Sequence, residues 1–156
     1  MTSKLEALET WASGLLEQLQ PGARNQLART IAQDLRRSQQ KRVLMQQNPD
    51  GSKFAPRKKR DLRGKQGRIR RKKEMFKKLR TATYLKAQGE SSTITVGFTG
   101  RIARIARVHQ YGLKDYAERG APDIRYEQRE VLGLTDLDLD VIRDGLLAHL
   151  TKKQDN

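Results

Sequence analysis

The sequence predicts an α+β fold: one domain with a small antiparallel β-sheet flanked by helices, an N-terminal helical hairpin and a long, flexible basic arm. Three patterns lead to this prediction. Leucine recurs at helical spacing near the N-terminus, apolar and polar residues alternate with a period of two over residues 93–98, and Lys and Arg crowd one stretch between them. The 156 residues include only eight aromatic side chains, so the core is expected to be small and aliphatic.

Residues 3–19 are predicted to form the first helix, because apolar side chains recur every three or four positions and share one face. These side chains are Leu5, Leu8, Ala12, Leu15, Leu16 and Leu19. Ser3 and Glu6 have the spacing of a capping box at the start of this helix, and Pro21-Gly22 is expected to end it. The apolar face must pack on the second helix or on a neighbouring subunit.

A second helix is predicted over residues 23–47. Its first half carries apolar residues on one face, whereas Gln and Arg dominate after Arg36. The second half is therefore expected to be solvated or to touch a partner. Together the two helices, residues 1–47, are predicted to form an antiparallel hairpin.

The basic arm is predicted over residues 48–67. It begins with the turn sequence Asn48-Pro49-Asp50-Gly51, and the lack of any apolar period after that turn predicts a flexible segment that orders on binding. A helix is expected at about residues 68–80. Between Lys53 and Arg80 the chain has 15 Lys/Arg and two acids, so this stretch carries +13 of the net charge of +15.

An α+β core is predicted over residues 68–150. Within it, residues 82–87 and 93–98 are expected to form a β-hairpin, because Ile, Val and Phe alternate with Thr and Gly in the second segment. The turn is placed at residues 88–91, where Gly89 would supply the positive φ that such turns need.

A short helix is predicted to follow from Arg101. Thr99 is its expected N-cap, and Gly112 is expected to end it in the left-handed conformation. Residues 113–124 are predicted to be a loop, and residues 124–132 are either a short third strand or an extended segment.

The last helix is predicted from Thr135 to His149. Thr135 and Asp138 form a capping box, and the alternating aspartates at 136–140 lie where the helix dipole favours negative charge. That position explains the aspartates without a metal ion. Residues 151–156 are expected to be a disordered tail.

The sequence contains no constellation of residues typical of an enzyme. His109 and His149 are the only histidines, and neither is near a Cys, a pair of Glu or a second His. His109 lies on a mostly apolar helix face, which favours a packing or polar-contact role over catalysis. There is no glycine-rich phosphate loop. We therefore predict a non-enzymatic protein with no cofactor and no metal.

The absence of cysteine excludes disulfides and thiolate metal sites. No apolar run approaches the ~20 residues that span a bilayer, and no signal peptide is visible. A soluble chain without a membrane partner is expected.

The basic stretch has two candidate binding targets, and its charge also has a third explanation that involves no partner. Its 15 cations could bind nucleic acid through phosphates, with steep salt dependence. They could equally reach an acidic groove on a neighbouring protein. The third explanation is a merely solvated basic loop. Phe54 is the only aromatic residue in the loop part, so base stacking is not expected to be a main term.

Four segments together resemble the virion morphogenesis, or tail completion, proteins of contractile-tailed bacteriophages. They are NPDGSKFAPRK (48–58), KEMFKKLR (73–80), VGFTGRIARIARVHQYGLKD (96–115) and RYEQREVLGLTDLDLDVI (125–142). The order and spacing of these segments cover most of residues 40–150. In the segment before Arg129 this chain has Tyr126-Glu127-Gln128 where many members have Pro or Ala.

The resemblance implies a structural protein that assembles as a ring, commonly hexameric, at the head-proximal end of the tail. Such proteins finish the tube and sheath and make the tail competent for head joining. The implied partners are other copies of the chain, the tail tube protein, the sheath protein and the head–tail connector, with the DNA in the tail axis as a further candidate. The implied location is the virion tail, after assembly in the cytoplasm of the bacterial host.

The residues predicted to contact partners are clustered cations and polar groups beside these motifs. They are Lys58, Lys59, Arg60, Arg70, Arg71, Lys72, Arg101, Arg104, Arg107, His109, Tyr111, Arg125 and Arg129. The alternative function is that of a general nucleic-acid-binding protein that uses residues 53–80.

Overall fold

The computed structural model describes residues 2–17, 19–57, 74–90, 93–116 and 119–152. Helices and two small antiparallel sheets occur together, which confirms the predicted α+β class. The helices are α1 (Thr2–Leu16), α2 (Pro21–Leu44), α3 (Arg101–Tyr111) and α4 (Asp136–Lys152). The strands are β1 (Leu85–Gly89), β2 (Ile94–Phe98), β3 (Lys114–Tyr116) and β4 (Asp123–Arg125).

The chain forms two compact units, each assembled from segments that are distant in sequence. The first, named here the helical unit, comprises Met1–Ser38, Leu85–Gly97 and Leu134–Asn156. The second, the mixed unit, comprises Gln39–Tyr84 and Phe98–Gly133. Each unit has its own hydrophobic core.

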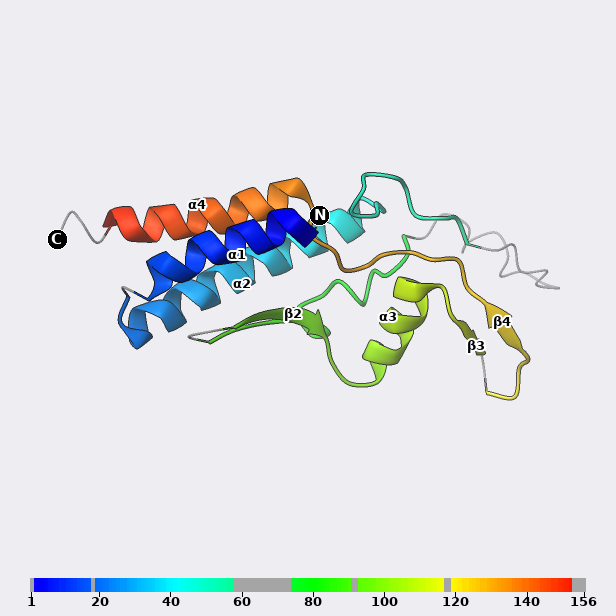
Figure 1. Ribbon diagram of the computed structural model, residues 1–156. Helices are drawn as coiled ribbons and strands as arrows, with labels where there is room; N and C mark the ends of the chain where they lie inside the picture. Colours follow the sequence, from blue (N-terminus) through cyan, green and yellow to red (C-terminus); the bar gives the residue numbers. More distant parts are fainter. Residues whose placement is uncertain (1, 18, 58–73, 91–92, 117–118, 153–156) are drawn as a thin grey trace. The chain divides into compact units, whose positions relative to one another are not determined.

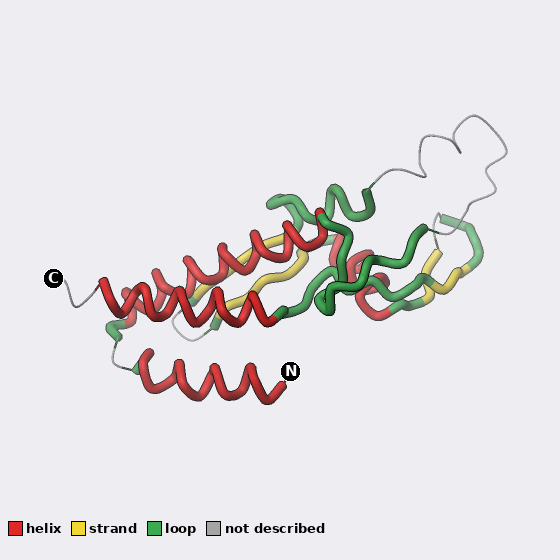
Figure 2. The backbone as a smooth tube through the Cα atoms, turned by 90° about the horizontal axis from the view of Figure 1, so that it is seen from above, coloured by secondary structure: helices red, strands yellow, loops and turns green. Residues whose placement is uncertain are grey.

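In the helical unit, α1, α2 and α4 lie side by side (Figures 1 and 2). Their facing stripes are apolar at spacings of three and four, and these side chains form an aliphatic core. The buried members are Ala12, Leu19, Leu27, Ile31, Leu35 and Leu146. The arrangement is consistent with the predicted helical hairpin, although two boundary predictions were wrong. Ser3 lies inside α1 and not at its cap, and Pro21 is the first residue of α2, a position that proline favours.

Strands β1 and β2 form the predicted hairpin, but Gly89 has a different role from the one expected. It is the last residue of β1 and is absent from the positive-φ residues of the described chain. A Cβ at Gly89 would lie 2.3 Å from the carbonyl carbon of Ala28 in α2. Glycine is required here because the strand presses directly on a helix backbone.

The start of α4 is fixed by the predicted capping box. The Asp138 N–H donates to the Thr135 hydroxyl at 3.1 Å, and the Thr135 N–H donates to the Asp138 carboxylate at 2.9 Å. The Ser38 hydroxyl donates to the same carboxylate. Asp138 is buried, so the structure uses it to join α4 to α2.

The core of the mixed unit combines aliphatic and aromatic residues. Its buried members are Val43, Phe54, Ala106 and Val131, and Met75, Phe76 and Phe98 pack against them. Gly112 ends α3 in the left-handed conformation (φ 62°, ψ 51°), as predicted. The N-terminus of α3 differs from the prediction: the cap is Gly100 at φ 69°, without a side-chain hydrogen bond, so Thr99 is not the cap.

Two further predictions of secondary structure differ from what the structure shows. Residues 114–116, expected to be part of a loop, pair with β4 in the register Lys114↔Arg125, Asp115↔Ile124 and Tyr116↔Asp123. Residues 75–80 form turns and not the end of a helix, while residues 68–73 of the predicted helix lie outside the described residues.

The second half of α2 was predicted to be solvated or to touch a partner, but Gln39 and Arg42 are instead buried within the chain, at 3% and 8% exposed. The Arg42 guanidinium donates to four oxygens of the mixed unit: the carbonyls of Gln47, Glu130 and Val131 and the Gln39 side chain. The Gln39 side-chain oxygen also accepts from the Gly133 N–H at 3.1 Å. Arg42 thus joins the end of α2 to the extended segment before α4.

Candidate partner-binding site

The two ends of the basic stretch, residues 53–80, meet in the mixed unit. The Phe54 ring, near its start, and the Phe76 ring, near its end, are in edge contact with centroids 5.5 Å apart. Phe76 also contacts His109 at 4.8 Å, and His109 contacts Tyr126 at 5.1 Å. We name these four rings the aromatic anchor. Residues 57 and 74, between which the chain is not described, therefore both lie close to these four rings.

Gln46 ties both ends of the basic stretch to the end of α2. Its carbonyl accepts from the Phe54 N–H at 2.8 Å. Its side-chain amide holds both backbone groups of Met75, accepting from the N–H and donating to the carbonyl, each at 2.9 Å. Gln46 (φ 58°) and Phe76 (φ 66°) are the two non-glycine residues with positive φ in the described chain. Such backbone conformations cost energy and persist where surrounding contacts hold them.

Arg129 fixes Ala55 and Pro56, near the start of the basic stretch. Its guanidinium donates to the Ala55 carbonyl at 2.6 Å and to the Pro56 carbonyl at 2.9 Å, and it lies 3.4 Å from His109 Nδ1. Its backbone N–H donates to the His109 carbonyl at 2.7 Å. Arg129 is 4% exposed. Its fork geometry serves the chain's own carbonyls, which makes it a positioning residue for the start of the basic stretch.

The His109 ring is neutral at physiological pH. Burial lowers the pKa of His109 from 6.5 to about 4, and the positive charges of Arg129 and Arg57 add to this effect. A neutral ring is required because it packs between aromatic edges and next to a guanidinium. Protonation would place two cations side by side, so the anchor is expected to loosen in acid.

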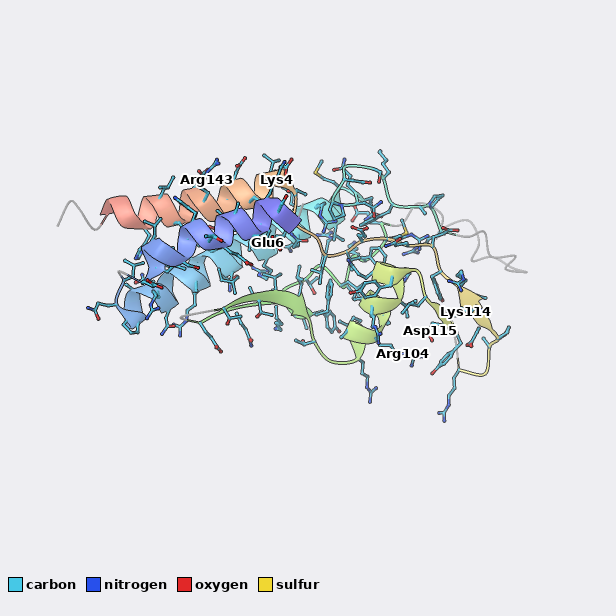
Figure 3. All side chains as sticks on the ribbon, viewed as in Figure 1. Lys4, Glu6, Arg104, Lys114, Asp115 and Arg143 are labelled. Atoms are coloured by element: carbon cyan, nitrogen blue, oxygen red, sulfur yellow. The ribbon has the colours of Figure 1, made fainter. Side chains whose placement is uncertain are left out.

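A separate surface of the mixed unit combines cations with exposed aromatic rings. Arg104, Arg107 and Tyr111 follow each other at helical spacings of three and four on α3, and Tyr111 is 64% exposed. We name these three residues the Tyr111 face. Arg104 donates to Asp115 on β3 at 2.5 Å (both labelled in Figure 3). Its guanidinium also lies 4.8 Å from the centre of the Tyr116 ring.

The ribbon beside this face carries a like-charge pair. Lys114 on β3 stands directly opposite Arg125 on β4, an arrangement that is unfavourable in a sheet. Three of the ribbon's residues flank this pair with exposed side chains: Tyr116, Asp123 and Ile124. In the described parts of the chain, Arg101, Arg107 and Lys114 form no ion pair. An anionic partner would therefore find cations not yet neutralised.

The structure separates the predicted contact residues into three groups. Lys58, Lys59, Arg60, Arg70, Arg71 and Lys72 lie outside the described residues. Exposed on α3 and β4 are Arg101, Arg104, Arg107, Tyr111 and Arg125. His109 belongs to the aromatic anchor and Arg129 lies beside it, and both bind other parts of the same chain. Their role with partners stays a prediction.

Sequence reasoning missed Gln46 and Phe76 as parts of this site. Nothing in the local pattern marks them, because their partners lie about 30 residues away or on another element.

Two negative observations complete the description. Among the described residues no group of three His, Cys, Asp or Glu could hold a metal ion. No described helix is long and apolar enough to cross a membrane.

Comparison with known proteins connects this fold to phage assembly. The model of the phage virion morphogenesis family matches residues 3–151. Tail completion protein S of Escherichia phage P2 is 37% identical over 151 residues, which cover 96% of this chain and 99% of that protein. No solved structure is similar enough to count as a match. The resemblance predicted from the motifs is confirmed: the chain belongs to the phage virion morphogenesis family.

Proposed function

We propose that this protein is a structural, non-enzymatic component that completes the tail of a bacteriophage by binding other tail or head components. The observation that carries the proposal is the 37% identity to a tail completion protein over nearly the full length of both chains. Similarity that extends over the whole chain supports a shared role better than one shared motif would.

The finer form of the proposal places the protein at the head-proximal end of the tail. There it assembles as a ring, with six copies as the expected number, on the last ring of the tube and sheath. It then makes the tail competent to join the head connector. The support is the family's role in virion morphogenesis, together with an exposed cationic surface that suits an acidic neighbour.

Two parts of the chain are proposed to make these contacts. One is the basic stretch, whose ends are fixed by the aromatic anchor and whose sequence carries +13. The other is the surface of α3 and the β3–β4 ribbon, where Arg101, Arg107 and Lys114 have no ion-pair partner among the described residues.

Complementation of a phage that lacks this gene tests the proposal. Electron microscopy of lysates without the protein is expected to show DNA-filled heads beside unjoined tails, with tubes of irregular length. Joined virions of normal tail length in that lysate would overturn it.

The same assay tests the contact residues. Replacing Arg70, Arg71 and Lys72 together by Glu is expected to abolish head joining, because attraction to an acidic surface becomes repulsion. Arg29→Glu, at an exposed arginine of α2 that forms no ion pair among the described residues, is a control for charge reversal elsewhere on the surface and should complement fully. A full yield of infectious phage from the triple variant would remove the basic stretch from the assembly contacts.

A nucleic-acid-binding function is the second candidate, and the concentration of charge within residues 53–80 is the observation that favours it. Binding of duplex DNA measured between ~0.05 and ~0.2 M salt separates the two functions. A steep loss of affinity across that range, with tight binding near ~0.15 M, would indicate many phosphate contacts. Weak binding that is independent of the triple substitution would exclude DNA as the main target.

A further inference from the structure

The helical unit carries an open groove between α1 and α4. Its apolar lining is formed by Ala7, Leu8, Trp11 and Leu139, and its rim includes Asp136 and Asp140. Trp11, the only tryptophan of the chain, is 40% exposed there. We name this the Trp11 groove; Lys4 and Arg143, which stand at its rim, are labelled in Figure 3.

The carboxylates on the rim are available to a partner. Asp136 pairs with Lys4 at 3.5 Å, and both side chains are more than two-thirds exposed. Asp140 pairs with Arg143, three residues further along the same helix, at 2.9 Å. Ion pairs as exposed as these contribute little, so either carboxylate can exchange its partner at small cost.

The Tyr111 face of the mixed unit has the complementary features. Tyr111 projects an aromatic ring that is 64% exposed, and Arg107, one helical turn before it, has no ion pair among the described residues. Tryptophan, tyrosine and arginine are the residue types that most often carry the energy of protein interfaces. One surface offers an apolar groove whose rim carries two carboxylates in weak, exposed pairs with Lys4 and Arg143. The other surface offers an aromatic ring flanked by cations.

We propose that these two surfaces bind each other between copies of the chain: Tyr111 of one copy enters the Trp11 groove of another, and Arg107 meets the rim carboxylates. The partner is a second copy because every copy carries both surfaces, and each supplies groups that the other can bind: an exposed aromatic ring with a cation, and an apolar groove with exchangeable carboxylates. The inference deepens the proposed function and rests on it for the ring.

The two surfaces are different, so the contact is head-to-tail. A copy bound through its Tyr111 face still has a free Trp11 groove, and each addition leaves the same two ends. Such an interface closes into a ring when its rotation closes, and otherwise grows as an open filament. A two-fold dimer would also satisfy both surfaces if the two contacts formed at once between two copies, and assemblies larger than dimers would exclude that arrangement.

Sedimentation of purified full-length protein over a range of concentrations tests the contact. Wild type is expected to form assemblies larger than dimers, and Tyr111→Ala to weaken assembly at least about tenfold, as for truncation of a central interface residue. Tyr111→Phe should assemble like wild type, because the aromatic side chain at position 111 remains. Arg107→Glu should also weaken assembly, because it places a carboxylate against the rim carboxylates, and Arg29→Glu controls for its charge change. A wild-type chain that is monomeric at all concentrations would overturn the inference, as would Tyr111→Ala assembling normally.

Mixing two variants gives the sharper result. Tyr111→Ala keeps its groove and Trp11→Ala keeps its Tyr111 face, so each alone should be monomeric. Their equimolar mixture should form a dimer and stop there, because one intact contact remains and neither end can extend. A mixture that stays monomeric would contradict the head-to-tail contact. If Trp11→Ala fails to fold by circular dichroism, Asp140→Lys takes its place in the mixture. The double variant Arg107→Glu with Asp140→Lys, in which the charge pair is reversed on every copy, should assemble again.

The result can be told apart from a failure of tail completion. If the wild-type gene restores joined virions while the protein remains monomeric, tail completion stands and the copy-to-copy contact is wrong. If the mixture dimerises but the gene is dispensable for tails, the contact stands and the function is wrong.

Discussion

The two units are stabilised by different physical means. The core of the helical unit is almost entirely aliphatic, with Leu27, Ile31 and Leu146 at its centre. The mixed unit has fewer buried aliphatic residues and instead depends on long polar side chains that bind distant carbonyls. Arg42, Gln46 and Arg129 are the principal ones. Apolar packing tolerates some change of shape, whereas a buried hydrogen-bonding group cannot lose its partner without leaving another group unsatisfied.

Replacing Arg42 should have the largest effect. Arg42→Met preserves length and apolar volume but leaves the carbonyls of Gln47, Glu130 and Val131 without their donor. A loss of about 4 kcal/mol in the free energy of unfolding is expected, since buried groups lose charge-assisted hydrogen bonds. Urea denaturation measures it. Hydrogen exchange should rise first at residues 129–133, and a uniform rise across both units would contradict the assignment to the mixed unit.

A cavity in the core of the helical unit should lower the free energy of unfolding by somewhat less than the Arg42 substitution. Leu146→Ala removes a side chain that is 4% exposed and in contact with the aliphatic core. The expected loss is about 3 kcal/mol. Leu146→Met is the matched control, because a volume-conserving change should cost about 1 kcal/mol or less. Equal losses for Ala and Met would show that the core does not depend on close packing at this position.

Acid should weaken the mixed unit through His109. Its folded pKa of about 4 lies below the ordinary value of 6.5, so the unfolded chain binds a proton more readily between these pH values. The contribution is complete above pH ~6.5 and is lost as pH falls toward ~4, on the order of 2 kcal/mol for a half-buried ring. Urea midpoints at a series of pH values measure this. His109→Phe should abolish that part of the pH dependence, and an unchanged pH profile would count against it.

The junction at Gln46 should show a smaller and more local effect. Gln46→Gly relieves the positive φ but removes both side-chain bonds to Met75. A loss of about 1–2 kcal/mol is expected. A spin-label or fluorophore pair at residues 57 and 74 should report a wider distance distribution. If the distribution matches wild type, the aromatic anchor, Arg129 and the Gln46 carbonyl hold residues 57 and 74 in place without the Gln46 side chain.

A substitution on the surface of the helical unit should change the free energy of unfolding the least. Lys4→Ala breaks an exposed pair with Asp136 at 3.5 Å, and the free energy of unfolding should change by no more than about 0.5 kcal/mol. Thermal unfolding at low and high salt checks this. A larger loss would mean that the rim of the Trp11 groove is already part of the fold, which would weaken its proposed role as a docking surface.

The sequence by itself determined the features that depend on near neighbours. The apolar stripes of α1, α2 and α4, the alternation in β2, the capping box of Thr135 with Asp138 and the left-handed stop at Gly112 all follow from short spacings. Each is set by contacts within about four residues, which a single sequence displays directly. The family resemblance also followed from motifs whose order is visible in the chain.

Only the tertiary structure decided the contacts between distant segments. Gly89 was predicted for a turn but is needed where β1 presses on α2. Arg42 and Arg129 look like surface cations in sequence, yet they are buried because the carbonyls that they bind come from other segments. The pairing of β3 with β4 likewise depends on which strands meet in space. Hydrogen-bond partners and close backbone approaches are properties of the assembled fold, and no local pattern encodes them.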